Sequence, residues 1–472
     1  MNISDSLKNS KFITYGIGEV INKIATFFFL PFAAFYMTPD EFGAAGILIP
    51  LIQSLQGVVI FGLSISLLKY YNDFPSKIRA INFNIVIFYF LLILLYLIIT
   101  AILKYFKIFD NIYIGSYSLD AYVFFLLFTI IVSSTVQIIL QKYQATYDSK
   151  KFVIVNTSSR IGLILLLLIA VYIIQIEVKA LTLILIIFIN GIIFSLYSLI
   201  SLLKESIPRV EIEMFKKFII IGLPLFINGI SSYILQMNGR FILNNKIGIE
   251  MVAAYSFLYS ISQFVFLAIS VYNRVFLPDY YSVLSKSNQI KKYLNDNLIY
   301  STKIISYISI IFVPIAYVII GFYENTLYNT YMYYLPLLII MYLPYNLYLY
   351  STNYLAYYEK TYLTLIISVI TGILSIVSNI FLIDYFGILG LFISQVLFQF
   401  IFAVLLSFLV RDKENKLIIN YKNYLSIILI PTIILFILSY IKMNFVLTIF
   451  IGFIASVALF FEIKKNSYKI II

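Results

Sequence analysis

The residues of this chain that could do chemistry are charged side chains placed inside long apolar runs. Glu19 and Lys23 lie at i and i+4 in the first run, so a helix would carry both on one face. A charge deep in a bilayer costs on the order of 3 kcal/mol and therefore needs a partner or a wet cavity. Two interpretations stay open. The pair is either a neutralised ion pair at a helix interface, or a cavity face where Lys23 meets an anionic substrate and Glu19 couples H+ or Na+.

Other basic and amide side chains within or beside the apolar runs could line the same cavity. Arginine suits a phosphate because its planar fork can donate to two oxygens at once. Two members also have simpler explanations, since Arg160 could extend to the membrane surface and Lys69 could anchor the end of a span. The candidate substrate-binding residues are Lys23, Lys69, Arg160, Asn228, Gln236, Arg240, Arg274 and Asn379.

Neutral polar and aromatic residues form a second group of candidates. The amides within the apolar runs are Gln53, Gln56, Gln263, Asn346, Asn353, Asn379, Gln395 and Gln399. Such amides either bind sugar hydroxyls or make hydrogen bonds between helices. The tyrosine-rich stretch 331–350 could stack on sugar rings, or form an aromatic belt at the membrane surface.

Prolines interrupt the runs that we take as the first spans of the two halves of the chain. Pro31 and Pro224 each remove a backbone hydrogen bond and can kink a helix. They are candidate hinges for a change between inward and outward states, or static kinks tolerated by packing.

The elements that must position these residues are transmembrane helices. The chain has 472 residues, of which 62% are hydrophobic and 11% charged, whereas a soluble domain carries roughly 25% charged residues. Apolar runs of about twenty residues, the length that spans a bilayer as a helix, recur throughout. They are too long for barrel strands. We predict an all-α integral membrane protein with about fourteen spans.

The distribution of basic residues predicts the orientation of the chain. The net charge is +12, yet the Lys and Arg residues fall mainly in alternate connecting segments. This asymmetry is the positive-inside pattern, so both termini are expected in the cytoplasm and the basic excess does not indicate nucleic-acid binding. The segments predicted to face outward hold only Lys104, Lys107, Lys179, Arg240, Lys246 and Lys442.

Missing residue types argue against several kinds of chemistry. The chain contains neither Cys nor His, so it offers no thiolate or imidazole to a metal and no Cys–His nucleophile pair. It also lacks the glycine loop of nucleotide-binding proteins. We therefore expect no cofactor, no metal and no enzymatic activity. The enzymatic alternative, a membrane-embedded polysaccharide polymerase, usually needs a large outer loop, whereas every predicted outward loop here is short.

An internal repeat is predicted from short motifs that recur in the same order. Lys11-Phe12 followed by Gly16 and Asn22 matches Lys217-Phe218 followed by Gly222 and Asn228. The sequence YQATYD at 143–148 matches YLAYYE at 354–359, and Gly162 matches Gly372. An even number of spans separates the copies, so the halves would be parallel repeats of the kind found in alternating-access transporters. We expect an N-lobe at 1–205, a C-lobe at 206–410, and two appended helices at 411–472.

Three longer motifs carry a resemblance to a known family. Residues 39–43 read PDEFG and are followed by FGLS at 61–64. Residues 239–243 read GRFIL, where Gly239 replaces the usual acidic residue, and lead to AYS at 254–256. Residues 379–390 read NIFLIDYFGILG, with Asp384 in place of the usual proline. Together they resemble the multidrug/oligosaccharidyl-lipid/polysaccharide (MOP) exporter superfamily, and within it the Wzx-type flippases of O-antigen and capsule synthesis.

This resemblance implies two lobes around a central cavity and a function in transport. The implied cargo is an undecaprenyl-diphosphate-linked oligosaccharide, moved across the bacterial cytoplasmic (inner) membrane from the cytoplasmic to the periplasmic leaflet. It also implies contact with membrane lipid. A polysaccharide polymerase and its chain-length machinery are candidate partners. Other branches of the superfamily remain alternatives, namely lipid II flippases, teichuronic-acid exporters and multidrug/cation antiporters.

Overall fold

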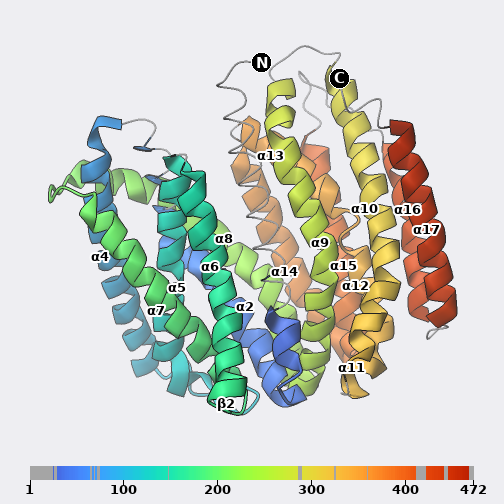
Figure 1. The fold of residues 1–472 in the computed structure, drawn as a ribbon, viewed down its shortest axis with the longest axis horizontal. Coiled ribbons are helices and arrows are strands. Elements are labelled where there is room, and N and C mark those ends of the chain that lie inside the picture. Colours follow the sequence, from blue (N-terminus) through green and yellow to red (C-terminus); the bar gives the residue numbers. More distant parts are fainter. Residues whose placement is uncertain are drawn as a thin grey trace. The chain divides into compact units, whose positions relative to one another are not determined.

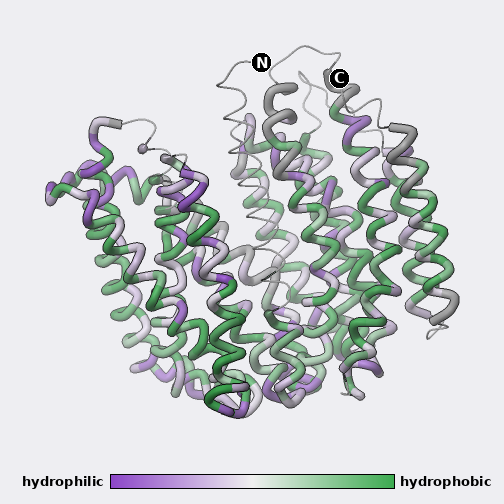
Figure 2. Tube along the Cα trace, viewed as in Figure 1, coloured by the Kyte–Doolittle hydropathy of each residue, from purple (hydrophilic) through white to green (hydrophobic). Residues whose placement is uncertain are grey.

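The protein is built almost entirely of long helices. The computed structural model describes residues 25, 29–63, 66–67, 70–71, 75–146, 148–284, 290–323, 326–358, 360–410, 421–440 and 445–466. Within these residues, eleven helices are long and apolar enough to cross a membrane. Hydrophobic residues occupy their middle stretches and hydrophilic residues gather toward their ends (Figure 2). The all-α membrane fold is thus confirmed, while the number of fourteen spans stays a prediction.

The chain forms two compact units, Met1–Ala253 and Ala254–Ile472 (Figure 1). The expected lobes were defined by a sequence repeat rather than by compactness, and their boundaries at 205/206 and 410/411 stay a prediction. The helices of the first unit are α2 (Pro39–Ile60), α4 (Ile78–Tyr105), α5 (Leu119–Ala145), α6 (Ser149–Leu168), α7 (Ala180–Lys204), α8 (Ile212–Lys246) and the start of α9 (Ile249–Leu284).

Short elements join these helices. A 3-10 turn, η1 (Pro75–Lys77), leads into α4, and a π-helical turn, η2 (Ile169–Ile173), extends α6. Between α4 and α5, β1 (Tyr113–Ile114) and β2 (Tyr117–Ser118) pair as an antiparallel hairpin. The first unit therefore has a hairpin end, at β1 and β2, and a linker end, where residues 205–211 join α7 to α8.

The second unit contains the rest of α9 and the helices that follow it. These are α10 (Ile290–Gly321), α11 (Thr326–Tyr331), η3 (Met332–Tyr334), α12 (Leu335–Ile340), α13 (Tyr345–Tyr357), α14 (Thr361–Phe386), α15 (Ile388–Leu409), α16 (Tyr421–Tyr440) and α17 (Phe445–Asn466). Helices α16 and α17, red in Figure 1, both pack against α10.

Helix α2 is the central helix of the first unit, where it packs against α5, α7 and α8. Thr38 caps its start by accepting from the Glu41 amide at 3.4 Å, and Pro39 occupies the first turn, where no amide donor is needed. Phe61 and Gly62 end the helix with φ of 51° and 69°. The sequence around α2 thus sets both ends of the helix on which the unit packs.

Glycine allows two close backbone approaches at the predicted family motifs. A Cβ atom at Gly43 would lie 2.2 Å from the Ile249 carbonyl oxygen, so only glycine lets α2 meet the start of α9 there. In the second unit, Gly387 (φ 60°) turns the chain from α14 into α15, and a Cβ at Gly390 would lie 2.0 Å from the Leu382 carbonyl oxygen. Both motifs therefore contain glycines that the local packing requires.

The repeated motifs YQATYD and YLAYYE end helices in the same way. The first closes α5 at Ala145 before α6 begins at Ser149, and the second closes α13 at Tyr357 before α14 begins at Thr361. This local likeness agrees with the predicted repeat.

A pair of glycine substitutions on α2 tests the close approach to α9. Gly43→Ala forces the Ile249 backbone to move and should lower the free energy of unfolding by about 1–3 kcal/mol. Gly57→Ala is the matched control, because nothing lies within 4 Å of a Cβ there, and it should be neutral or stabilising by about 0.5–1 kcal/mol. Thermal unfolding of the purified protein in detergent measures both. Equal stability of the two variants would contradict the packing constraint.

Candidate functional site

At the hairpin end of the first unit, one carboxylate joins three elements. Glu41 Oε2 accepts a hydrogen bond from the Tyr117 hydroxyl at 2.6 Å and another from the Ala180 amide at 2.8 Å. Ala180 begins α7, where exposed amides favour a negative group. Burial, and then the hydrogen bond to Glu41, raise the pKa of Tyr117 and keep its hydroxyl protonated as a donor. Glu41 of the PDEFG motif therefore has a structural role.

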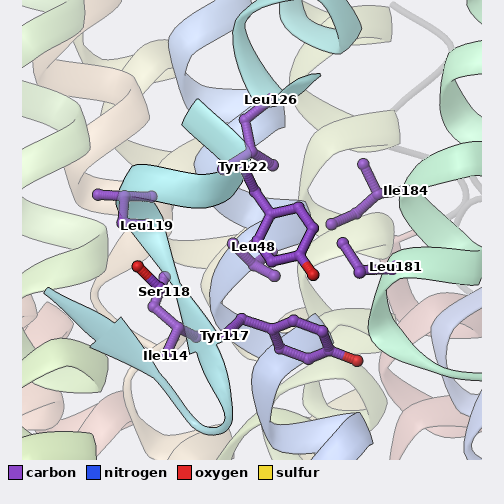
Figure 3. Close-up of a pocket in the computed structure, with 9 residues that line it drawn as sticks. All are labelled: Leu48, Ile114, Tyr117, Ser118, Leu119, Tyr122, Leu126, Leu181 and Ile184. Carbon is purple, nitrogen blue, oxygen red and sulfur yellow. The ribbon is translucent and has the colours of Figure 1, made fainter. Parts of the chain in front are cut away.

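Beside this carboxylate lies a mainly apolar pocket with an empty volume of about 230 Å³. Leu48, Leu181 and Ile184 surround the ring of Tyr122, and Tyr117 lies below it (Figure 3). The two rings meet edge to face with centroids 5.8 Å apart. Its lining offers few polar groups for recognising a sugar or a phosphate.

At the linker end of the first unit, a lysine is buried next to the end of α7. Lys142 is 2% exposed and pairs with Glu205 at 2.9 Å, while it also donates to the Ser201 carbonyl at 3.1 Å. Glu205 itself is 57% exposed. Lys142 lies in the last turn of α5. The structure makes it a link between α5 and α7.

The segment that joins α7 to α8 is fastened to the start of α4. Asn82 donates to the Glu205 carbonyl at 3.0 Å, and Asn84 donates to the Arg209 carbonyl at 2.8 Å. Asn84 also accepts from the Glu211 amide at 2.8 Å, and Lys77 forms an ion pair with Glu211 at 3.3 Å. Both asparagines are fully buried. These contacts bind residues 205–211 to the start of α4 and to Lys77, within the first unit.

Substitutions at the Lys142–Glu205 pair should have unequal effects. Glu205→Gln leaves a buried ammonium without its counter-charge and should lower the free energy of unfolding by about 2 kcal/mol. Lys142→Met removes the buried charge and leaves an exposed carboxylate, so it should be close to neutral. Thermal unfolding in detergent compares the two. A larger loss in Lys142→Met than in Glu205→Gln would contradict this account.

The second unit contains a pocket of a different character, which we call the amide pocket. Its empty volume is about 250 Å³, and it lies among α9, α10 and α13. The lining residues that the structure describes are uncharged and combine amides, hydroxyls and rings. The lining residues are Tyr272, Asn273, Phe276, Tyr280, Leu298, Ser301, Asn346, Tyr350 and Asn353.

Hydrogen bonds fix the amides of this pocket. Asn346 donates to Ser301 at 2.7 Å and to Thr302 at 3.1 Å, which joins α13 to α10. Asn353 donates to the Asn273 side-chain oxygen at 2.8 Å, which joins α13 to α9. These bonds make the amides links between α13 and its neighbours α9 and α10.

Two of the predicted substrate-binding residues are buried within their own units. Arg240 is 4% exposed and donates from Nη1 to the Gly46 carbonyl at 2.7 Å, a contact that joins α8 to α2. Asn379 is fully buried in α14 and donates to Ser375 at 3.4 Å. Arg160 is half-buried on α6. These contacts describe structural roles, and the predicted roles in substrate binding stay predictions.

The other predicted residues are only partly placed. Asn228, Gln236 and Pro224 lie on α8, and Arg274 lies on α9, but the positions of their side chains fall outside what the structure describes. Pro31 is buried in the helical segment before α2. Glu19, Lys23 and Lys69 lie outside the described residues.

Comparison with known proteins assigns the chain to a family. A family model described as "Polysaccharide biosynthesis protein" matches residues 9–283, which is more than half of the chain. The chain belongs to the polysaccharide biosynthesis protein family. No curated protein matched the sequence in a direct search.

Solved structures confirm the MOP superfamily fold. The lipid II flippase MurJ in an inward closed conformation has a TM-score of 0.71 at 17% identity, and the alignment covers 97% of this chain and 100% of MurJ. An inward-facing multidrug resistance MATE family transporter of the MOP superfamily has a TM-score of 0.64 at 13% identity, over 84% of this chain and 94% of the transporter. An outward-facing MATE transporter has a TM-score of 0.62 at 13% identity, over 85% and 94%. The predicted superfamily resemblance is therefore confirmed, and the polysaccharide family agrees with its Wzx branch.

Sequence reasoning missed much of the amide pocket. Asn346 and Asn353 were among the candidates, Asn273 was not, and Tyr350 ends the tyrosine-rich stretch. Tyr272, Phe276, Tyr280 and Ser301 were not singled out. On α9, Tyr272, Phe276 and Tyr280 recur every fourth position, a helical spacing that marks one face and could have indicated them.

Proposed function

We propose that this protein is a flippase for an undecaprenyl-diphosphate-linked oligosaccharide, an O-antigen or capsule repeat unit. It moves this cargo from the cytoplasmic to the periplasmic leaflet of the bacterial inner membrane by alternating access. The observation that carries the proposal is the match to the polysaccharide biosynthesis family over residues 9–283, in a chain of MOP superfamily fold. We infer transport rather than catalysis, since the sequence has neither Cys nor His to serve as a nucleophile or base.

Loss of the protein should trap its cargo on the cytoplasmic side. We expect a single lipid-linked repeat unit to accumulate in cells that lack the protein, protected from a periplasmic glycosidase until the membrane is permeabilised. Mass spectrometry of extracted lipids identifies the cargo, and a plasmid copy of the gene serves as the control. Accumulation facing the periplasm would instead indicate a polymerase or ligase. Accumulation of lipid II would favour a lipid II flippase, and no accumulation would favour a drug or ion antiporter.

The charged residues predicted to line the cavity give a second test. Lys23→Ala and Arg240→Ala should each slow translocation while the protein still inserts, because an anionic diphosphate loses a compensating charge. Lys246→Ala is the matched control, since Lys246 is an exposed basic residue at the end of the same helix as Arg240. The rate of repeat-unit appearance in the periplasmic leaflet, divided by the amount of protein in the membrane, is the measurement. Wild-type rates in both alanine variants would exclude a role for these charges.

A further inference from the structure

We propose that Gln53 on α2 and Gln263 on α9 face water within the membrane and form hydrogen bonds with saccharide hydroxyls of the cargo as it crosses. This inference rests on the proposed flippase function and names two residues that contact the sugar. Three observations carry it: the exposure of both side chains, their depth in the helices, and their equivalent positions in the internal repeat.

Each glutamine lies at an opening in a helix that is otherwise covered. Gln263 is the one exposed residue of α9 between positions 251 and 273. In α2, only Gln53 and Gly57 are exposed after Asp40, and nothing lies within 4 Å of a Cβ atom placed at Gly57. The protein therefore leaves one patch of each helix uncovered, and each patch carries an amide.

Both amides lie far from the start of their helices. Each is the fifteenth residue of its helix, which places it about 21 Å along the axis at 1.5 Å per residue. Among the helical amides whose side chains the structure describes, the other exposed ones lie within three residues of a helix end. They are Gln144, Asn245 and Asn423. A position at the end of a span therefore explains those three but neither Gln53 nor Gln263.

Contact with lipid does not satisfy an amide. The exposed face of α4, which carries Leu91 and Leu95, is apolar, as contact with hydrocarbon requires. An amide in the same surroundings costs free energy unless protein or water pairs with it. Neither glutamine forms a hydrogen bond to a residue that the structure describes, whereas Gln56, on the same helix as Gln53, donates to Ser133 at 2.9 Å. Water is the partner that remains.

The two glutamines occupy equivalent positions of the internal repeat. The first residues of α2 and α9 differ by 210 positions, the same offset that relates Gly162 to Gly372. In this register, three residue types coincide between the helices: Ala44 with Ala254, Leu48 with Leu258 and Gln53 with Gln263. The alanines and leucines are buried and the glutamines exposed in both helices. Residue type and exposure therefore recur together, as expected if both halves keep the same role.

The chemistry of an amide fits a sugar hydroxyl. A glutamine side chain offers two donors and an acceptor oxygen, and a hydroxyl pairs with either kind of group. The amide carries no charge, so it does not compensate a diphosphate. An amide that exchanges water for a sugar hydroxyl gains little net free energy. Such contacts guide a polar cargo through the membrane without holding it there.

Replacing each amide by an apolar side chain of similar length tests the contacts. Gln53→Met and Gln263→Met should each slow translocation per protein roughly two- to tenfold, the effect of about one lost hydrogen bond. Their thermal stability in detergent should not fall, because neither amide bonds to a described residue. Gln56→Met is the matched control. It breaks the bond to Ser133, so it should lower stability while translocation per folded protein stays at the wild-type rate.

Cysteine labelling tests the exposure to water directly. Because the chain has no Cys, Gln53→Cys and Gln263→Cys each introduce a single thiol. A small charged thiosulfonate reagent does not enter hydrocarbon, so it should modify both thiols at least about tenfold faster than those of Leu91→Cys and Ile373→Cys. These controls replace exposed apolar residues in the middle of α4 and α14. Inverted vesicles and spheroplasts present the two sides of the membrane to the reagent.

The cargo should protect both thiols from the reagent. In membranes from cells that make the lipid-linked saccharide, labelling should slow at least about threefold relative to membranes from cells lacking the sugar-phosphate transferase that begins its synthesis. Membranes of the second kind still contain undecaprenyl phosphate. Equal labelling in the two would therefore exclude a contact with the saccharide at these positions.

The flippase and the glutamine contacts can fail separately. A cytoplasmic pool in cells lacking the protein, with wild-type translocation by both methionine variants, would overturn the contacts and leave the flippase standing. Labelling of both cysteines as slow as that of Leu91→Cys would also overturn them. Absence of the pool would overturn the flippase itself. Slower translocation by Gln53→Met and Gln263→Met, together with fast labelling and protection by the saccharide, is the result that we expect.

Discussion

Every polar group within these helices must find a partner inside the protein, because the hydrocarbon core of a membrane offers no water. Serine and threonine side chains meet this demand locally by donating to carbonyls one turn earlier, as Thr129 does to Phe125 and Ser306 to Thr302. Longer side chains meet it between helices. Arg240 reaches Gly46, and Lys142 reaches both Ser201 and Glu205. Much of the packing of each unit follows from this requirement.

The amide pocket departs from this rule in an informative way. Asn346 and Asn353 are fixed by neighbours as the rule demands, yet the buried Tyr350 hydroxyl is not satisfied by any described residue. Other described residues, Tyr317 among them, also hold buried hydroxyls of this kind.

The class of the protein could be predicted from sequence because hydropathy and charge asymmetry are local properties. The family motifs were also visible, but their physical reasons were not. Gly43 matters because of Ile249, which lies far along the chain, and Glu41 because of Tyr117 and Ala180. Within the pocket, Asn346 and Asn353 are seven residues apart and so share a helical face. Their meeting with Ser301 and Asn273 depends on how α9, α10 and α13 pack, which no single stretch of sequence encodes. Lys142 could not be singled out from sequence because its partner, Glu205, lies more than sixty residues later, in the segment after α7.

The fastening of residues 205–211 to α4 has a consequence for synthesis of the protein in the membrane. Asn82 and Asn84 are made early, but the backbone groups that satisfy them lie 123 to 127 residues later in the chain. Before the ribosome reaches residue 211, Asn82 can pair with Tyr71 and Asn84 with the Ala80 carbonyl, but the hydrogen bonds to the connector are still missing, at a cost of about 0.5–1.5 kcal/mol each. The start of α4 therefore cannot complete its hydrogen bonds before the connector emerges. A nascent chain stopped just short of this connector would lack the hydrogen bonds between it and the start of α4, a defect that membrane quality-control proteases could recognise.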